Sequence, residues 1–294
     1  MKFHLIYKSK DDNGNDNKIP ELFKNACKER ELEFVGYDMC EFGKSFTLSD
    51  APKLGKGDLL YRSASSTEAI TLERVMVTKD ATTFHTDLHA LNSARIASWF
   101  THQQYGLPVV PTYPGIPSTK EEIESVVEKL GSFPIIIKVT GGSLGVGVMR
   151  IDSMKSLQSI LDYLKAKGAK VMLRKYIPHD YYVRAVVVGD EVVASNATYV
   201  LDGEFRTNVA TNEDQKRETK ILPKEVQKAV VDAVRTLKRE TGGVDLIFDK
   251  EENPYIAEVN FPNDFHTAQK VTKIDIAGKM IDYLIEKEKN TDSK

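Results

Sequence analysis

The chain has 294 residues, of which 41% are hydrophobic, and a formal net charge of -2 at pH 7. This length predicts about two or three domains, and the near-neutral charge gives no electrostatic basis for binding nucleic acid. No apolar run is long enough to span a membrane, and the first residues lack the apolar core of a signal peptide. The cysteines, Cys27 and Cys40, are too few for a disulfide framework or a zinc site. They are typical of buried thiols in a reducing, cytoplasmic compartment.

The first ninety residues predict a small α/β domain. Apolar segments at 1–8 and 31–39 are expected to be strands flanking a helix at about 19–31, and residues 57–65 predict a further strand. Arg62 follows an apolar run near the end of this last segment. Its side chain either reaches a substrate carboxylate or is simply solvated, and the sequence leaves both alternatives open.

Three histidines occur between residues 85 and 102, and a proline-rich segment follows them. His85, His89 and His102 lack metal-ligand spacing on one predicted face, and we expect ordinary polar or partly buried side chains. Residues 106–119 read GLPVVPTYPGIPST, which predicts a strand with turns. This segment is suited to be a hinge between domains.

Residues 134–148 read PIIIKVTGGSLGVGV, which predicts a strand, a flexible hairpin tip and a second strand. Lys138 would point out of an otherwise buried strand. Glycines at positions 141, 142, 145 and 147 permit positive φ and let backbone N–H groups approach phosphate oxygens closely. The residue order fits neither a P-loop nor a dinucleotide-binding fingerprint. The alternative is an ordinary hairpin with a mobile tip.

A second hairpin carries oxygen ligands. Residues 242–249 and 253–260 predict two apolar strands joined by a short charged turn. Glu258 and Asn260 are two positions apart and project from the same face, and Asp245 can lie beside them on the paired strand. Two carboxylates and an amide suit Mg²⁺. The alternative is a strand with a solvated polar face.

Six stretches of the chain resemble the ATP-grasp superfamily and, within it, the RimK-like carboxylate-amine (amino acid/glutamate) ligases. They are FPIIIKVTGGSLGVGV (133–148), KYIPHDYYVRAVVVGDEVVAS (175–195), GEFRTN (203–208), GGVDLIFD (242–249), IAEVN (256–260) and IDIAGKMIDYLIEK (274–287). The resemblance covers about residues 90–288. It implies an α/β (α+β) ATP-grasp fold with an N-terminal small α/β pre-ATP-grasp domain. The implied divisions are that domain at 1–105, a central subdomain with the glycine hairpin at 106–180, and a C-terminal subdomain with the Mg²⁺ site at 181–290.

The resemblance also implies an ATP site. Lys138 would contact the α- and β-phosphates as a fixed cation, the hairpin would close over the β- and γ-phosphates, and a linker between two strands would hold adenine through backbone groups. The other ATP-binding residues implied are Gly142, Ser143, Leu144 and Gly145 in the hairpin, Arg174, Lys175, Tyr176 and Ile177 in the linker, and Asn208.

Metal-binding and catalytic residues follow from the same resemblance. Asp245, Glu258 and Asn260 would hold Mg²⁺, with Mn²⁺ as an alternative metal. Arg184 and Arg206 would be catalytic, near the transferred phosphoryl group and the substrate carboxylate, because a planar guanidinium pairs with such oxyanions. The alternative for each is an ordinary surface arginine at a strand end.

Two positions of the nucleotide site depart from the pattern of this family. The helix before the ATP-grasp domain usually carries a phosphate-contacting lysine, and that position is Ser93 here, with Arg95 one possible substitute. The acidic residue that usually ends the adenine linker is replaced by Tyr182. Asp180 or His179 would then take over the ribose contact.

The resemblance implies an ATP-dependent ligase that forms an amide through an acyl phosphate and releases ADP and phosphate. Its substrates would be an amino acid or another carboxylate, or a peptide or protein tail, and a homo-oligomer is compatible with the family. The loop at 261–270 reads FPNDFHTAQK instead of the usual small-residue turn, so the acceptor is expected to be unusual. The alternatives are an ATP-grasp kinase and a non-catalytic nucleotide-binding protein.

Overall fold

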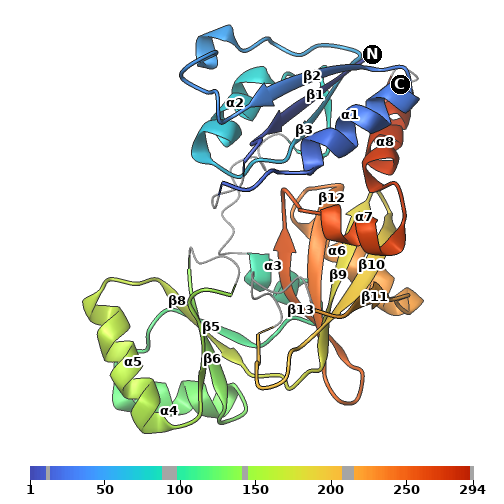
Figure 1. Ribbon diagram of the computed structural model, residues 1–294. Helices are drawn as coiled ribbons and strands as arrows, with labels where there is room; N and C mark the ends of the chain where they lie inside the picture. Colours follow the sequence, from blue (N-terminus) through green and yellow to red (C-terminus); the bar gives the residue numbers. More distant parts are fainter. Residues whose placement is uncertain (11–13, 88–97, 141–144, 207–214, 292–294) are drawn as a thin grey trace.

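The computed structural model describes residues 1–10, 14–87, 98–140, 145–206 and 215–291, which contain three β-sheets (Figure 1). The first sheet is parallel, with strand order β2-β1-β3-β4. Its elements are β1 (Lys2–Tyr7), α1 (Ile19–Glu29), β2 (Glu33–Asp38), the 3-10 turn η1 (Leu48–Asp50), β3 (Asp58–Arg62), α2 (Thr67–Met76) and β4 (Thr82–Thr83). The strands and the helix predicted for the first ninety residues are confirmed.

Helix α1 packs through the apolar face that its sequence predicts. Ile19, Phe23, Ala26 and Cys27 are spaced so that they share one side of a helix, and all four are buried. Burial raises the pKa of the Cys27 thiol to about 11, so the thiol stays protonated at neutral pH. Cys40 is only partly buried, in contrast to the expectation for both cysteines.

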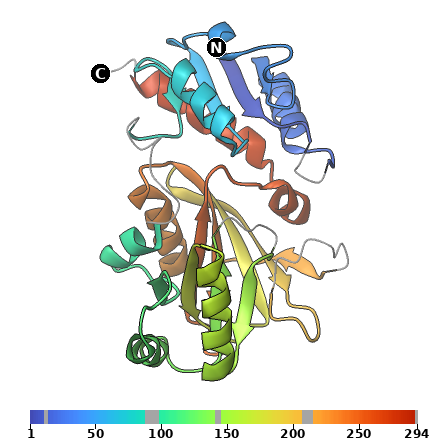
Figure 2. The same cartoon turned by 90° about the vertical axis from the view of Figure 1, so that its left-hand side faces the viewer.

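The C-terminal helix α8 (Ile276–Thr291) returns to the N-terminal sheet, so both ends of the chain lie in the same part of the molecule (Figures 1 and 2). Met280 and Leu284 of this helix share a hydrophobic core with Phe3 of β1. The buried Glu288 accepts a hydrogen bond of 2.6 Å from the backbone of the loop before β3. In the described part of the chain, we find no helix whose length and apolar character would let it cross a membrane.

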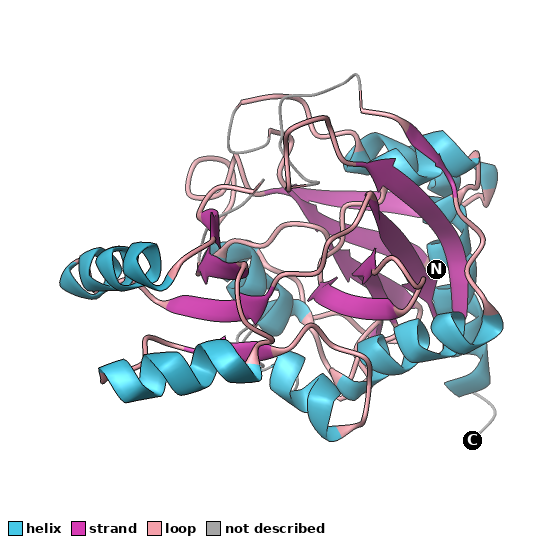
Figure 3. Ribbon diagram, turned by 90° about the horizontal axis from the view of Figure 1, so that it is seen from below, coloured by secondary structure: helices cyan, strands magenta, loops and turns pink. Residues whose placement is uncertain are grey.

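The second sheet is antiparallel, with strand order β5-β8-β6-β7, and it carries the predicted glycine hairpin. In its hydrophobic core, the apolar side chains of the helices α4 and α5 pack against buried residues of the strands. Seen from below, these helices project at the left of the molecule (Figure 3). The elements are β5 (Thr112–Pro114), α4 (Lys120–Lys129), β6 (Ile135–Val139), β7 (Val148–Ile151), α5 (Met154–Ala166) and β8 (Val171–Lys175).

The third sheet is also antiparallel, with strand order β11-β10-β9-β12-β13. Helix α6 packs on the face that carries Val183, Ala185 and Val187 of β9, so the alternate residues of β9, among them Arg184, belong to the opposite face. The elements in and around this sheet are α3 (Ser98–Gln104), β9 (Tyr181–Val188), β10 (Glu191–Tyr199), β11 (Arg217–Thr219), α6 (Lys224–Thr236), β12 (Thr241–Phe248), β13 (Pro254–Asn260) and α7 (His266–Thr272).

A buried ion cluster lies at the carboxyl end of β3. Arg62 is 5% exposed, and its Nε donates to Glu73 Oε2 at 2.7 Å, while His85 Nε2 lies 3.2 Å from Glu73 Oε1. The solvated alternative for Arg62 is therefore wrong, because its guanidinium is engaged by a carboxylate that α2 turns inward. His85 and His102 are 6% and 2% exposed, more buried than the ordinary polar or partly buried side chains expected, and His102 bonds a backbone carbonyl of α6. His89 lies outside the described residues.

The Glu73→Gln variant is expected to lower the unfolding free energy at about pH 7 by about 3 kcal/mol, because it leaves the buried Arg62 guanidinium without its anion. Burial alone would raise the pKa of Glu73, but the hydrogen bond from His85 and the charge of Arg62 outweigh it and lower the pKa. A carboxylate with a lowered folded-state pKa stabilises fully above its unfolded value, here 4.5, and loses this contribution as the pH falls through the folded value. Urea unfolding between about pH 7 and pH 3 should show the difference between the two proteins shrinking with acidity. A constant difference would contradict this assignment.

Candidate active site

Three side chains on adjacent strands form a row on one face of the third sheet. Asp245 of β12 stands opposite Arg184 of β9 on one side and opposite Glu258 of β13 on the other. Residues directly opposite in an antiparallel pair project from the same face. Asn260, two residues beyond Glu258, stands opposite Gly243. The sheet therefore brings together the two carboxylates, the amide and one arginine named by the sequence analysis.

The Asp245 carboxylate is engaged on both oxygens. Arg184 donates from Nε to Oδ1 at 2.6 Å and from Nη2 to Oδ2 at 3.2 Å, and Asn260 Nδ2 donates to Oδ2 at 3.1 Å. Burial raises the pKa of Asp245 and the Arg184 charge opposes that rise. Burial opposes the charge on Arg184, but Asp245 outweighs it and raises the pKa of the guanidinium. We take the pair to be ionised, because a bidentate guanidinium-carboxylate geometry favours both charges.

Lys138 reaches this row from the second sheet. It lies on β6, and its Nζ donates to Glu258 Oε2 at 3.0 Å, with side-chain exposures of 26% and 43%. The contact joins residues 120 positions apart in the chain. Strand β6 therefore meets the end of the row at β13, and the four charged side chains Lys138, Arg184, Asp245 and Glu258 are two cations and two anions.

The donor set fits a hard divalent cation. Asp245, Glu258 and Asn260 offer carboxylate and amide oxygens on neighbouring strand positions, the donor chemistry that Mg²⁺ prefers. Within the described ranges, no cluster of three or more histidine, cysteine or acidic side chains is placed to hold a metal. Two carboxylates are enough for Mg²⁺, which usually keeps several waters and binds substrate phosphates as well.

Arg174, at the start of the predicted adenine linker, connects the two sheets. Its Nε donates to Thr112 Oγ1 and its Nη2 to the Ala257 carbonyl, both at 3.1 Å. Burial lowers the pKa of Arg174 to about 10, and the charge of Glu258 opposes that shift. The side chain therefore ties β8 to the strand that carries Glu258. No pattern in the sequence indicates this role, since the family resemblance implies only a backbone contact of Arg174 with adenine.

The rest of the linker leaves β8 and turns toward β9. Lys175 has an exposed side chain, Tyr176 lies under Arg150, whose Cζ is 4.8 Å from the ring centroid, and Ile177 is buried. His179 Nδ1 lies 2.7 Å from the Ile177 carbonyl oxygen. That carbonyl already has a partner, and burial lowers the pKa of His179. Contacts of these residues with adenine stay predictions.

The glycine hairpin joins β6 to β7 in antiparallel register. Gly145 and Gly147 have φ values of 77° and 81°, in the left-handed region that favours glycine. Residues Gly142, Ser143 and Leu144, predicted to bind phosphate, lie outside the described residues. The described base of the hairpin thus shows the backbone conformation for which glycine is needed.

Arg206 lies in the segment after β10, and its guanidinium is bonded to a nearby carboxylate of the same segment. Its Nε and Nη2 donate to the two oxygens of Glu204 at 3.0 and 2.7 Å. The Arg206 hydrogen bond lowers the pKa of Glu204 to about 2. Glu204 was not predicted, although a carboxylate two residues before an arginine is a visible local signal. Asn208 lies outside the described residues.

Of the two positions in the nucleotide site that depart from the family pattern, only the one at Tyr182 lies in the described residues. Ser93 and Arg95 both lie outside the described residues. Tyr182 is part of β9, and the Asp180 carbonyl accepts a hydrogen bond of 2.8 Å from the backbone of Val200. A ribose contact by Asp180 or by its neighbour stays a prediction.

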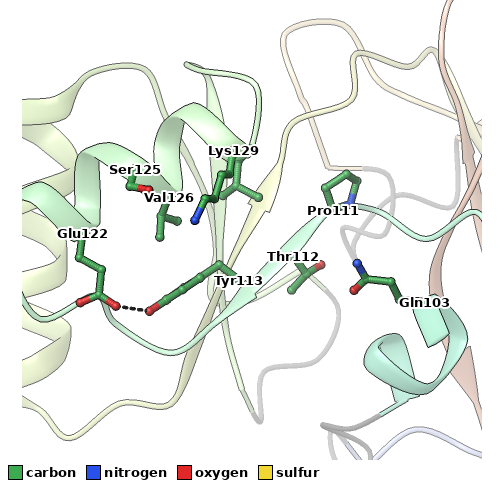
Figure 4. Close-up of a pocket in the computed structure, with 9 residues that line it drawn as sticks. Gln103, Pro111, Thr112, Tyr113, Glu122, Ser125, Val126 and Lys129 are labelled. Carbon is green, nitrogen blue, oxygen red and sulfur yellow. Dashed lines mark hydrogen bonds between the residues drawn. The ribbon is translucent and has the colours of Figure 1, made fainter.

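A pocket of about 320 Å³ lies away from the row, between α4 and β5, with a residue of α3 on its far side (Figure 4). The Tyr113 hydroxyl donates to Glu122 across it at 2.6 Å. None of the residues predicted to bind ATP or metal lines this pocket. Two of its lining residues contact the predicted adenine linker: Thr112 accepts the hydrogen bond from Arg174, and the Pro111 carbonyl accepts one of 3.0 Å from the backbone of Lys175.

The sequence is similar to that of glutamate ligases over part of its length. Ribosomal protein bS6--L-glutamate ligase of Escherichia coli O7:K1 is 29% identical over 197 residues, which are 66% of this chain and 63% of that protein. A probable alpha-L-glutamate ligase of Citrobacter koseri is 27% identical, with the same coverage of 66% and 63%. The chain therefore matches less than two thirds of the length of these curated relatives.

Solved structures show the same fold at low sequence identity. The ATP-grasp ligase PsnB complexed with minimal precursor has a TM-score of 0.73 at 17% identity, covering 97% of this chain and 99% of that chain. The macrocyclase MdnC bound with precursor peptide MdnA, from Microcystis aeruginosa MRC, has a TM-score of 0.68 at 14% identity, covering 97% and 99%. D-alanine--D-alanine ligase from Bacillus anthracis has a TM-score of 0.65 at 17% identity, covering 99% and 98%. The expected ATP-grasp fold is thereby confirmed. The family model described as the RimK-like ATP-grasp domain matches residues 103–284, more than half of the chain, and the chain therefore belongs to the RimK-like ATP-grasp family.

Proposed function

We propose that this protein is an ATP-dependent ligase that joins a carboxylate to an amine and releases ADP and phosphate. The observation that carries the proposal is the row of Arg184, Asp245 and Glu258, with Lys138 reaching Glu258 from the opposite sheet. Two cations and two carboxylates in one place can together bind a nucleotide and its metal ion. The cations suit the phosphates, and the carboxylates suit the metal.

In the first step, a carboxylate oxygen of one substrate bonds to the γ-phosphorus of ATP, and the bond from that phosphorus to the β-γ bridging oxygen breaks. ADP leaves and an acyl phosphate forms. In the second step, the amine nitrogen bonds to the acyl carbon, the carbon-oxygen bond to phosphate breaks, and the amine loses a proton. The chain needs no nucleophile of its own for this sequence, so positioning and charge stabilisation carry the catalysis.

Each charged side chain of the site has a role in this scheme. Lys138 would bind the phosphates, and Arg184 would stabilise the negative charge that spreads over the transferred group. Asp245, Glu258 and Asn260 would hold Mg²⁺, or Mn²⁺, which would supply further neutralisation of phosphate charge. The glycine hairpin, when closed over the nucleotide, would keep water from the acyl phosphate.

The proposed substrates are an amino acid or other small carboxylate and an amine-bearing partner, with a peptide or protein tail included. Two findings support this range: the Escherichia coli relative is named for a ribosomal protein and L-glutamate, and the MdnC and PsnB structures hold precursor peptides or a minimal precursor. We also propose a cytoplasmic location, which the buried free thiol of Cys27 supports. The absence of nucleic acid among the partners and a homo-oligomeric state stay predictions.

The proposal is tested by incubating the purified protein with Mg-ATP, a pool of amino acids and small carboxylic acids, and hydroxylamine. Hydroxylamine traps acyl phosphates, so the expected product is a hydroxamate formed together with ADP, and its mass identifies the activated acid. A phosphorylated alcohol in place of the hydroxamate would establish a kinase instead. ATP binding without turnover, in the presence of peptide substrates as well, would favour a non-catalytic nucleotide-binding protein.

A further inference from the structure

The ring of Phe261 lies at the meeting point of three distant segments. Phe261 is 6% exposed and directly follows Asn260 at the end of β13. Arg239 Cζ lies 4.4 Å from its ring centroid and Arg62 Cζ lies 5.5 Å from it. The His85 ring packs edge-on, with centroids 5.1 Å apart. Cations within about 6 Å of an aromatic centroid are attracted by the ring.

These partners belong to parts of the chain that flank the candidate site. Arg62 ends β3 of the N-terminal sheet and His85 follows β4 by two residues, and both are bonded to the buried Glu73 of α2. Arg239 stands just before β12, the strand of Asp245. Replacing a buried ion pair by well-packed apolar residues is often neutral or stabilising, so stability alone is a weak explanation for this cluster. The cluster also contacts the Phe261 ring through Arg62 and His85.

The loop after Asn260 is bonded to the candidate site as well as to the N-terminal sheet. Asn260 Nδ2 donates to Asp245 at 3.1 Å, and the Asp264 carbonyl accepts from Arg184 Nη1 at 3.2 Å. Between them, the Asn263 backbone N–H donates to the Tyr61 hydroxyl of β3 at 3.4 Å. The Phe261 ring and the bond from Asn263 to Tyr61 thus both connect this loop to the N-terminal sheet.

We propose that Phe261 is a positioning residue that sets the end of β13, and with it Asn260 and the Asp264 carbonyl, by packing against Arg62, His85 and Arg239. The inference rests on the proposed function, because Asn260, which this packing would position, is one of the proposed Mg²⁺ ligands. It goes beyond that function by giving the N-terminal sheet a direct part in metal-dependent nucleotide binding.

The test compares the affinity for ADP with and without Mg²⁺ by calorimetry. In Phe261→Leu, which keeps an apolar side chain but removes the ring, the affinity gain from Mg²⁺ is expected to fall about tenfold, which lies between the values for an exposed and a fully desolvated cation-π contact. The affinity for ADP without Mg²⁺ should not change. Phe261→Tyr, which keeps an aromatic ring, should show the wild-type gain in affinity from Mg²⁺. Phe248→Leu is the matched control, because Phe248 is 4% exposed on β12 but packs on the α6 side. It should leave the gain unchanged.

Arg239→Met provides a second variant in case Phe261→Leu does not fold. It removes the nearest cation and keeps an apolar stem, and the gain from Mg²⁺ is expected to fall about threefold. If both variants fold and keep the wild-type gain in ADP affinity from Mg²⁺, Phe261 is not a positioning residue, and the proposed function is unaffected. A wild-type protein with no gain from Mg²⁺ would instead overturn the proposed metal site, and this inference with it.

Discussion

Replacing Glu258 with glutamine is expected to lower the rate of ADP formation by about three orders of magnitude, because metal-ion stabilisation of a phosphoryl group is worth several kcal/mol. Glutamine keeps the size of the side chain and removes its charge. The fold should survive, since Glu258 is 43% exposed and its ion pair with Lys138 is open to solvent. Such a pair contributes about 1 kcal/mol or less. Initial rates of ADP release and thermal unfolding would be measured on the same preparation.

Glu251→Gln is the matched control for this prediction. Glu251 is an exposed residue in the turn of the same hairpin, away from the row. The substitution makes the same chemical change and should leave both the rate and the melting temperature as they are. A Glu258→Gln protein that turns over ATP at the wild-type rate would remove Glu258 from the metal site. Equal losses in both variants would point to a general charge effect instead of a ligand.

The two hairpins could be predicted because the information for them is local. Runs of β-branched residues separated by glycines or by a charged turn specify a strand, a reversal and a second strand. The alternation of side chains then places Glu258 and Asn260 on one face, and the register of β12 and β13 sets Asp245 beside Glu258. No information from distant parts of the chain is needed for this part of the site.

The contacts between sheets could not be predicted, because no local pattern encodes them. The bond of Lys138 to Glu258 and that of Arg174 to the Ala257 carbonyl depend on how two sheets are placed relative to each other. Arg62 shows the same limit, since an arginine after an apolar strand is solvated unless another element brings it a carboxylate. Here α2 brings Glu73, and only the packed structure shows that the pair is buried.

Arg206 illustrates what a family resemblance adds and what it leaves open. The resemblance predicts that it lies near the transferred phosphoryl group, whereas the structure shows it bonded to Glu204, two residues earlier. A guanidinium binds carboxylates and phosphates in the same way. A phosphate carries the higher charge, so it would compete with the Glu204 carboxylate for Arg206. The catalytic role of Arg206 therefore stays a prediction, and that of Arg184 has the more direct geometry.

Arg184→Met is expected to lower the free energy of unfolding by about 2 kcal/mol, because it leaves the Asp245 carboxylate largely buried without its cation. The two side chains are 22% and 19% exposed, so solvent relieves part of the full cost of breaking a buried pair. Adding Asp245→Asn should recover about 1 kcal/mol or more, since the neutral amide tolerates burial better. Neither variant should form ADP at a measurable fraction of the wild-type rate, because each removes a group assigned to the reaction.

A double-mutant cycle separates this coupling from the general effects of each substitution. Urea unfolding of the wild type, both single variants and the double variant gives the interaction energy of the pair, expected at about 1 to 2 kcal/mol. The control cycle uses Lys228 and Asp232, an exposed pair at i,i+4 on α6 whose Nζ and Oδ2 lie 2.8 Å apart. Its coupling should stay below about 0.5 kcal/mol. An Arg184-Asp245 coupling no larger than this would mean that the pair is not held in the site as a unit, and Asp245 would then be free to act as a ligand without Arg184.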